Sequence, residues 1–304
     1  MESMEVPTPS KRLPPSILSP LRAAPLRVTL VQTALCWLDP QANRRQLEKK
    51  LLKLKDKTDL IVLPEMFTSG FTVEPEIMHA ANGTVAWLQA QAQFLGAAIT
   101  GSVACDLTDQ DIIGNETASK NISGNLVSNI GGDNKPRFVN RMLFVTPQGE
   151  MFNYDKVHLF KMADEHKRYQ AGNERCVINY MGWRILLTVC YDLRFPVFCR
   201  NRNDYDMMLC VANWPKTRAH HWRSLLIARA IENQAFVVGV NRVGIDGNGV
   251  EYSGDSLAID YLGELLVDKS NEWVETLVLD PQALIDYRQR FRAWEDADNF
   301  AIKI

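Results

Sequence analysis

The sequence has few cysteines, no long apolar run and no excess of either sign of charge. Its six cysteines among 304 residues contain no Cys-x-x-Cys pair, which argues against a disulfide-stapled secreted domain and favours a reducing, cytoplasmic location. No apolar run approaches the roughly 18 to 20 residues of a membrane-spanning helix, so we expect no membrane association. With 34 basic against 36 acidic residues the formal net charge is −2, which gives no overall electrostatic basis for a nucleic-acid partner.

The composition is that of an ordinary folded protein, with 46% apolar and 23% charged residues. We predict a single domain over residues 26–304, because no linker-like stretch divides it. Residues 1–25 are rich in proline and predict a tail outside the domain, with a targeting segment left open. Residues 106–136 are rich in Asp, Asn, Ser and Gly and predict a polar surface insertion, either a solvated loop or a lid near the active site.

Short apolar runs typical of buried strands alternate with segments of helical spacing along the whole domain. Single strands are predicted over residues 26–35, 60–63, 98–104, 184–189, 207–212, 236–240 and 276–279, and hairpins over 139–155 and 256–267. Helices are predicted over residues 41–56 and 221–234, and from residues 85 and 281 onward. This alternation predicts the α/β class with a mixed sheet or sheets.

Two strand ends carry residues that suit nucleophilic chemistry, since catalytic groups of α/β proteins gather at the carboxyl ends of strands. Glu65 follows the apolar run 60–63, and Cys190 follows the run 184–189 at the start of a polar turn. Cys190 has the setting of a nucleophile elbow, in which the Tyr191 backbone N–H is an oxyanion donor. A salt bridge for Glu65 and a buried structural thiol for Cys190 are the alternatives. The structural interpretation fits the other five cysteines better: Cys36, Cys105, Cys176, Cys199 and Cys210.

A thiol nucleophile needs a neighbouring base or positive charge. Lys156 lies at a boundary between two predicted elements and is one candidate. The five histidines are others, and they stay open because the partners of a triad can be distant in sequence: His79, His158, His166, His220 and His221. No His or Cys group has the spacing of zinc ligands, and the glycines of residues 244–249 form neither a dinucleotide nor a phosphate loop. We therefore expect neither a metal nor a cofactor.

Three segments, in this order, resemble the signature segments of the nitrilase (carbon–nitrogen hydrolase) superfamily: Leu63-Pro64-Glu65, Tyr154-Asp155-Lys156-Val157-His158-Leu159-Phe160 and Val189-Cys190-Tyr191-Asp192-Leu193-Arg194-Phe195-Pro196. The resemblance continues through Ala212-Asn213-Trp214-Pro215, Asn241-Arg242-Val243-Gly244 and Ser253-Gly254-Asp255-Ser256, and it covers about residues 26–280. It implies a four-layer α-β-β-α sandwich of two mixed sheets, dimerised through the helices beside the nucleophile turn.

Residues 64–71, 160–166 and 294–300 resemble the omega-amidase branch of that superfamily, whose members hydrolyse the terminal amide of an α-keto acid such as 2-oxoglutaramate or 2-oxosuccinamate. The resemblance implies that Cys190 attacks the amide to form a thioester, and that Lys156 and the Tyr191 N–H stabilise the oxyanion. It also implies that Glu65 transfers the protons and that Glu165 positions substrate and lysine. The insertion at residues 106–136 departs from the short connection usual in the family.

The substrate itself stays open at this stage. The same Glu-Lys-Cys chemistry serves another aliphatic amide, an N-carbamoyl amine or a nitrile, and a non-catalytic dimeric scaffold is a remote alternative. The expected partners are a small amide, water and a second copy of the chain in a homodimer. A keto-acid carboxylate needs a cationic or N–H-rich anchor, and no residue of the sequence stands out as one. Arg194 is near the nucleophile turn, but pairing with Asp192 or a neighbouring carboxylate is at least as plausible a role.

Overall fold

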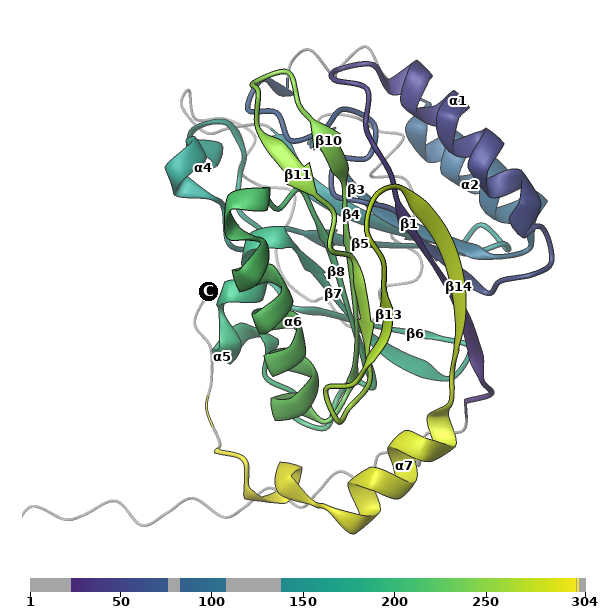
Figure 1. Cartoon of the computed structure of the whole chain (residues 1–304), viewed down its shortest axis with the longest axis vertical. Helices are drawn as coiled ribbons and strands as arrows, with labels where there is room; N and C mark the ends of the chain where they lie inside the picture. Colours follow the sequence, from purple (N-terminus) through teal and green to yellow (C-terminus); the bar gives the residue numbers. More distant parts are fainter. Residues whose placement is uncertain (1–22, 76–82, 108–137, 299, 301–304) are drawn as a thin grey trace, which may run out of the picture.

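The computed structural model describes residues 23–75, 83–107, 138–298 and 300 (Figure 1). Nearly all of the predicted tail (1–25) and of the predicted insertion (106–136) lies outside these residues, and so does His79. The described strands are β1 (Leu26–Gln32), β2 (Leu60–Val62), β3 (Ala98–Asp106), β4 (Phe138–Val145), β5 (Met151–Asp155), β6 (Cys176–Tyr180), β7 (Trp183–Val189), β8 (Met207–Ala212), β9 (Phe236–Asn241), β10 (Val243–Ile245), β11 (Glu251–Ser253), β12 (Leu257–Ile259), β13 (Leu265–Asp268) and β14 (Trp273–Leu279).

The described helices connect these strands. They are the α-helices α1 (Pro40–Leu51), α2 (Thr84–Leu95), α4 (Glu165–Arg168), α5 (Pro196–Cys199), α6 (Ala219–Asn233) and α7 (Pro281–Arg290), and the 3₁₀ helices η1 (Leu52–Leu54), η4 (Lys161–Ala163), η5 (Cys190–Arg194), η6 (Lys216–Arg218) and η7 (Ala293–Asp296). None of the helices within the described ranges is long and apolar enough to cross a membrane.

The strands form two mixed six-stranded sheets. One has the order β14-β1-β2-β3-β4-β5 and the other the order β13-β12-β9-β8-β7-β6. In the first sheet β1, β2 and β3 are parallel and the outer strands antiparallel, and in the second β7, β8 and β9 form the parallel centre. The remaining strands, β10 and β11, make a separate two-stranded hairpin.

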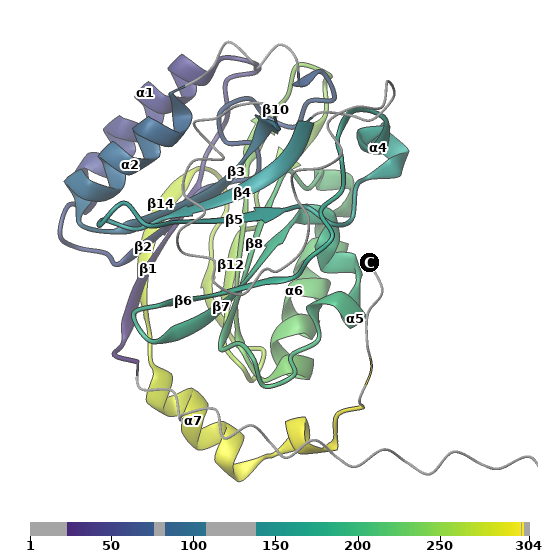
Figure 2. The same ribbon diagram turned by 180° about the vertical axis from the view of Figure 1, so that it is seen from behind.

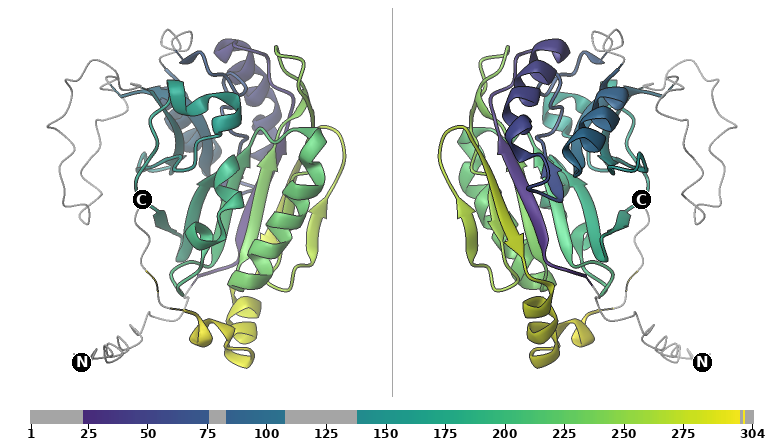
Figure 3. Two further views of the ribbon diagram at one scale, coloured as in Figure 1. Left: turned by 90° about the vertical axis from the view of Figure 1, so that its left-hand side faces the viewer. Right: turned by 90° about the vertical axis from the view of Figure 1, so that its right-hand side faces the viewer.

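The two sheets pack face to face, with α1 and α2 covering the outer face of the first and α6 that of the second (Figures 1 and 2). The side chains of β1 alternate accordingly: Val28 and Leu30 pack in the cluster shared with the second sheet, whereas Val31 packs in the cluster with α1 and α2. Views from the two sides show the same order of layers (Figure 3). The predicted four-layer α-β-β-α sandwich is therefore confirmed.

The predicted boundaries differ from the observed ones at several elements. Strand β1 ends at Gln32 instead of residue 35, and the first helix divides into α1 and η1. Strand β14 begins at Trp273, three residues before the predicted start, and β6, β10 and β11 were not predicted. The three-residue β10 is half-buried to exposed, so it lacks the run of buried apolar residues on which the prediction of strands depends.

Candidate active site

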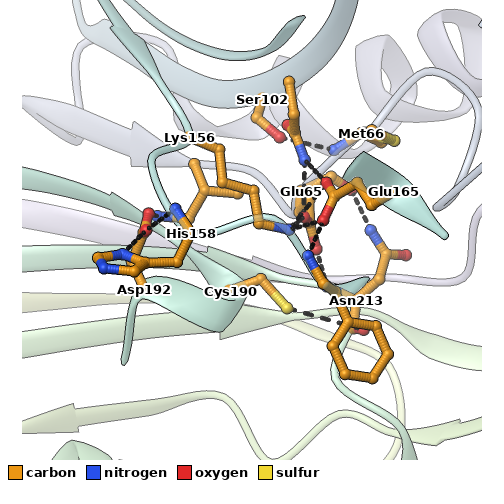
Figure 4. A network of polar contacts seen from close by, with 12 residues as sticks. Glu65, Met66, Ser102, Lys156, His158, Glu165, Cys190, Asp192 and Asn213 are labelled. Atoms are coloured by element: carbon orange, nitrogen blue, oxygen red, sulfur yellow. Dashed lines mark hydrogen bonds and ion pairs between the residues drawn. The ribbon is translucent and has the colours of Figure 1, made fainter. Parts of the chain in front are cut away.

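Glu65 lies in the turn that follows β2 and is completely buried. The turn is held against β3, because the Met66 N–H donates to Ser102 Oγ at 3.0 Å (Figure 4). Met66 itself has a φ of 43°, in the left-handed region that non-glycine residues seldom adopt. The fixed turn directs the Glu65 carboxylate between the two sheets, toward the ends of β5 and β7.

Lys156 follows β5 and brings a buried ammonium to this carboxylate. Its Nζ lies 3.0 Å from Glu65 Oε1 and 3.0 Å from each carboxylate oxygen of Glu165. Burial opposes the charged form of the lysine, but the charges of Glu165 and Glu65 outweigh this effect and hold the pKa of Lys156 well above its usual value. The lysine is therefore a fixed positive charge in a site without bulk solvent.

Glu165 is the first residue of α4 and is completely buried. Its Oε2 accepts the Phe160 backbone N–H at 2.5 Å, which fixes the carboxylate beside Lys156. Asn140 on β4 bridges the two acids, since its Nδ2 donates to Glu65 at 2.8 Å and to Glu165 at 3.3 Å. Burial raises the pKa of Glu165, and the charge of Lys156 partly offsets that rise.

Cys190 directly follows β7 and starts η5 with a φ of 48°, the sharp left-handed turn that the elbow interpretation requires. Its Sγ lies 4.0 Å from the Asn213 carbonyl oxygen and faces the cluster of acids and lysine (Figure 4). Burial and then the charge of Glu65 raise the pKa of the Cys190 thiol well above its usual value, and Lys156 works against this shift. The resting site therefore holds a neutral thiol.

Asn213, at the end of β8, joins Cys190 to Glu65. Its backbone N–H donates to Glu65 Oε2 at 2.7 Å, and its side-chain Nδ2 donates to the Glu65 carbonyl at 2.6 Å. Sequence patterns alone do not identify Asn213 or Asn140 as a site residue. Their one sequence signal is a polar residue inside an apolar strand, for Asn140, or directly after one, for Asn213.

The described histidines do not contact the Cys190 thiol. His158 Nδ1 lies 2.8 Å from Asp192 and its ring stacks on Phe195, His221 Nδ1 lies 3.1 Å from Arg194, and His166 and His220 are exposed. Of the candidate partners for the thiol, the histidines and Lys156, it is the charge of Lys156 that acts on Cys190 in the described structure.

One alternative and one expectation about individual residues do not hold. Among the described residues Arg194 pairs with no carboxylate, Asp192 included; its guanidinium lies over the Trp214 ring, 4.8 Å from the centroid, and beside His221. Asp192 is instead occupied by Val189, Tyr154 and His158. Cys36 is exposed rather than buried, because it lies in the loop between β1 and α1.

The other thiols behave as structural groups. Cys105, Cys199 and Cys210 are buried and Cys176 is half-buried, and burial raises the pKa of Cys176 to about 11 and that of Cys199 to about 12. Within the residues placed by the structure, no group of three or more His, Cys, Asp and Glu side chains has the arrangement of a metal site.

Comparison with known proteins decides the family. Residues 27–289 match the model of the carbon-nitrogen hydrolase family. The chain belongs to the carbon-nitrogen hydrolases. This carbon-nitrogen hydrolase is 46% identical over 280 residues to omega-amidase YafV of Escherichia coli (strain K12), covering 91% of this chain and 98% of that one. It is also 28% identical to the 2-oxoglutaramate amidase of Bacillus subtilis (strain 168), over 88% of this chain and 96% of the relative.

Solved structures agree with this assignment. The crystal structure of XC1258 from Xanthomonas campestris, a protein of the same superfamily with an arsenic adduct in its active site, superposes with a TM-score of 0.79 at 43% identity, covering 92% of this chain and 99% of that one. Nit3 of Saccharomyces cerevisiae, a member of branch 10 of the nitrilase superfamily, gives a TM-score of 0.71 at 20% identity, covering 88% and 94% of the two chains, and supports the fold alone.

Proposed function

We propose that this carbon-nitrogen hydrolase is an omega-amidase. It hydrolyses the terminal amide of an α-keto acid, such as 2-oxoglutaramate or 2-oxosuccinamate, to the dicarboxylate and ammonia through a thioester on Cys190. The relatives named as omega-amidase and 2-oxoglutaramate amidase support the reaction and its substrate. The cluster of Cys190, Glu65, Lys156 and Glu165 supports the mechanism.

The hydrogen bonds around Glu65 are the observation that carries the mechanism. An ionised carboxylate has about four lone-pair sites. Lys156 and Asn140 occupy two on Oε1, and the Asn213 N–H occupies one on Oε2. Among the described residues nothing donates to the remaining site on Oε2, which can therefore take the thiol proton. The Cys190 thiol lies nearby, because Sγ is 4.0 Å from the carbonyl oxygen of Asn213, the residue whose N–H binds Oε2.

The first half-reaction forms the thioester. Glu65 takes the Sγ–H proton as the sulfur attacks the amide carbon, so the buried thiol ionises only when its electrophile is bound. The carbonyl oxygen becomes an oxyanion, which the ammonium of Lys156 and the Tyr191 backbone N–H stabilise. Glu65 then returns the proton to the amide nitrogen, the C–N bond breaks, and ammonia leaves.

The second half-reaction restores the enzyme. Glu65 deprotonates a water molecule, which attacks the thioester carbonyl and forms a second oxyanion at the same donors. The C–S bond breaks, the carboxylic acid is released, and the proton held by Glu65 returns to the Cys190 sulfur. Glu165 keeps Lys156 in place throughout, because both of its oxygens bind the ammonium.

The assembly, the location and the ends of the domain complete the proposal. A homodimer formed through α5 and α6 is supported by the apolar side chains of Val197 and Ile231, which are 57% and 50% exposed. Few cysteines and the absence of a Cys-x-x-Cys pair support a cytoplasmic enzyme. We further propose that residues 26–304 form one hydrolase domain, that residues 1–25 are a tail, and that residues 106–136 are a polar insertion.

Ammonia release from 2-oxoglutaramate tests the function. Purified wild-type protein and the Cys190→Ala variant are compared on this amide, with glutamine, a simple nitrile and an N-carbamoyl amino acid in parallel. Turnover of the keto-acid amide that is lost in the variant supports the omega-amidase. Turnover of another substrate alone would support the thioester mechanism but reject a keto-acid amide as the substrate. Folded protein that hydrolyses none of a wider panel of amides would favour the non-catalytic scaffold.

A further inference from the structure

The site described above lacks a group to hold the distal carboxylate of its substrate. Its only cation among the described residues is Lys156, which two carboxylates already occupy. Two acids against one ammonium leave the cluster without attraction for an anion when both acids are ionised. This inference rests on the proposed function, in which the substrate is an α-keto acid and its carboxylate must meet a positive charge elsewhere.

Several arginines lie in the segments around the cluster. Arg141, beside Asn140 on β4, is paired with Asp155, and Arg168, on α4 with Glu165, is exposed. Arg242 is completely buried, and its guanidinium donates to the main-chain carbonyls of Leu35, Val243 and Ile245 and lies over the Tyr252 ring, so all of it except Nη1 is committed to the fold. Arg194 is engaged on both sides, since Trp214 covers its face and His221 contacts Nη2. Arg218 is half-buried, and within the described part of the chain its guanidinium has no hydrogen bond or ion pair.

The Arg218 guanidinium lies over the Phe160 ring, 5.4 Å from its centroid. A guanidinium held by its face keeps its in-plane N–H donors free, and these donors match a carboxylate in two parallel hydrogen bonds. The main chain is fixed as well, because the Trp214 indole N–H donates to the Arg218 carbonyl at 2.8 Å. The Arg218 guanidinium is therefore held in position while its positive charge stays unpaired among the described residues.

Phe160 places this guanidinium next to the reacting groups. Its backbone N–H holds Glu165, and its ring packs edge-on against Tyr191, whose ring centroid is 5.1 Å away. Tyr191 directly follows Cys190 and supplies the proposed oxyanion donor. Only Phe160 thus separates Arg218 from the catalytic cluster. The substrate has a matching extended shape, because a five-carbon keto acid with four C–C bonds of roughly 1.5 Å spans about 5 Å between its two ends.

We propose that Arg218 is the specificity-determining residue that binds the carboxylate of the keto-acid amide. With the carboxylate on Arg218, the chain of the substrate extends along the Phe160 and Tyr191 rings and places the terminal amide at Cys190. A neutral amide gains nothing from this contact, so Arg218 selects anionic amides over neutral ones of equal length.

The test compares two five-carbon amides that differ only in the carboxylate, glutaramate and pentanamide. In Arg218→Gln we expect kcat/KM for glutaramate to fall by about ten- to one-hundredfold, mainly through KM, as for a lost charged hydrogen bond. We expect kcat/KM for pentanamide to change less than threefold and Arg218→Lys to give an intermediate loss. Thermal melting of each variant checks the fold.

Arg194→Gln is the matched control, because Arg194 also stacks on an aromatic ring beside the site. Three outcomes would overturn the proposal. In Arg218→Gln, kcat/KM could fall equally for both amides or stay unchanged for glutaramate. In Arg194→Gln, kcat/KM could fall for glutaramate alone. Failure of the wild type to hydrolyse any keto-acid amide would reject the proposed function, whereas wild-type turnover with an unchanged preference in Arg218→Gln would reject the anchor alone.

Discussion

Asp192 accepts the backbone N–H of His158 at 2.9 Å, and its carboxylate also lies 2.8 Å from the His158 ring nitrogen Nδ1. Asp192 comes two residues after Cys190, and His158 comes two residues after Lys156. This contact therefore joins the nucleophile turn on one sheet to the lysine segment on the other (Figure 4). The distance between thiol and ammonium depends on it.

Replacing Asp192 with Asn tests this role. The carboxylate accepts from four donors, so an amide NH₂ in its place would face at least one buried N–H or O–H. We expect unfolding in urea to show a loss of about 2 to 3 kcal/mol and kcat to fall at least tenfold. Tyr154→Phe, which removes one donor and leaves the carboxylate, should keep most activity; wild-type kcat in Asp192→Asn would contradict the positioning role.

The reactivity of the Cys190 thiol should depend on Glu65. Because burial and the Glu65 charge raise the pKa of Cys190, alkylation by iodoacetamide should be slow at pH 7 and accelerate above pH 9. Glu65→Gln removes one of these causes, so we expect several-fold faster alkylation at pH 8 together with a loss of turnover of about a thousandfold. Mass spectrometry of the Cys190 peptide measures the rate, and the peptide of the exposed Cys36 is the internal reference. Slower alkylation in Glu65→Gln would contradict the claim that the Glu65 charge raises the pKa of Cys190.

The same raised pKa makes stability depend on pH. The folded protein keeps the Cys190 proton at a pH where the unfolded chain releases it, so this contribution is present below pH 9 and is lost as the pH rises beyond it. We expect the wild type to lose up to about 1.4 kcal/mol per pH unit above pH 9 relative to Cys190→Ala. Chemical denaturation of both proteins at pH 8 and pH 10 measures the difference, and parallel pH profiles would contradict the buried neutral thiol.

Local patterns were sufficient for the residues at strand ends. Glu65 and Cys190 each follow an apolar run that must be buried, so a polar group directly after the run stands at a sheet edge. Asn140 could not be found in this way, because it lies inside β4 and one asparagine in an apolar strand does not reveal what it binds. Glu165 came from the resemblance alone.

Long-range pairing was also beyond the local patterns. Strand β14 pairs with β1 across more than two hundred residues, with Leu26 opposite Leu279 and Gln32 opposite Trp273. The side chains of β14 are mostly half-buried, and the charged Glu275 separates Trp273 and Val274 from the rest of the strand, so the predicted strand starts only at Thr276. The resemblance supplied the two-sheet arrangement that periodicity left open.

Helix α7 offers a separate test of what holds the end of the domain. Asp206 is completely buried and accepts from Arg184 on β7 at 2.6 Å and from Arg288 on α7 at 2.8 Å. Asp206→Asn leaves two arginines without their carboxylate, so we expect a loss of about 3 to 5 kcal/mol in the free energy of unfolding.

The matched control is the ion pair of Arg223 with Asp268, which has a similar length of 2.7 Å but side chains that are 29% and 41% exposed. Because water screens an exposed pair, Asp268→Asn should cost about 0 to 1 kcal/mol. Urea titrations of the two variants measure the contrast. Equal losses in both would show that burial of Asp206 adds nothing to its pairing, and that α7 is held in place by its apolar contacts through Leu284 instead.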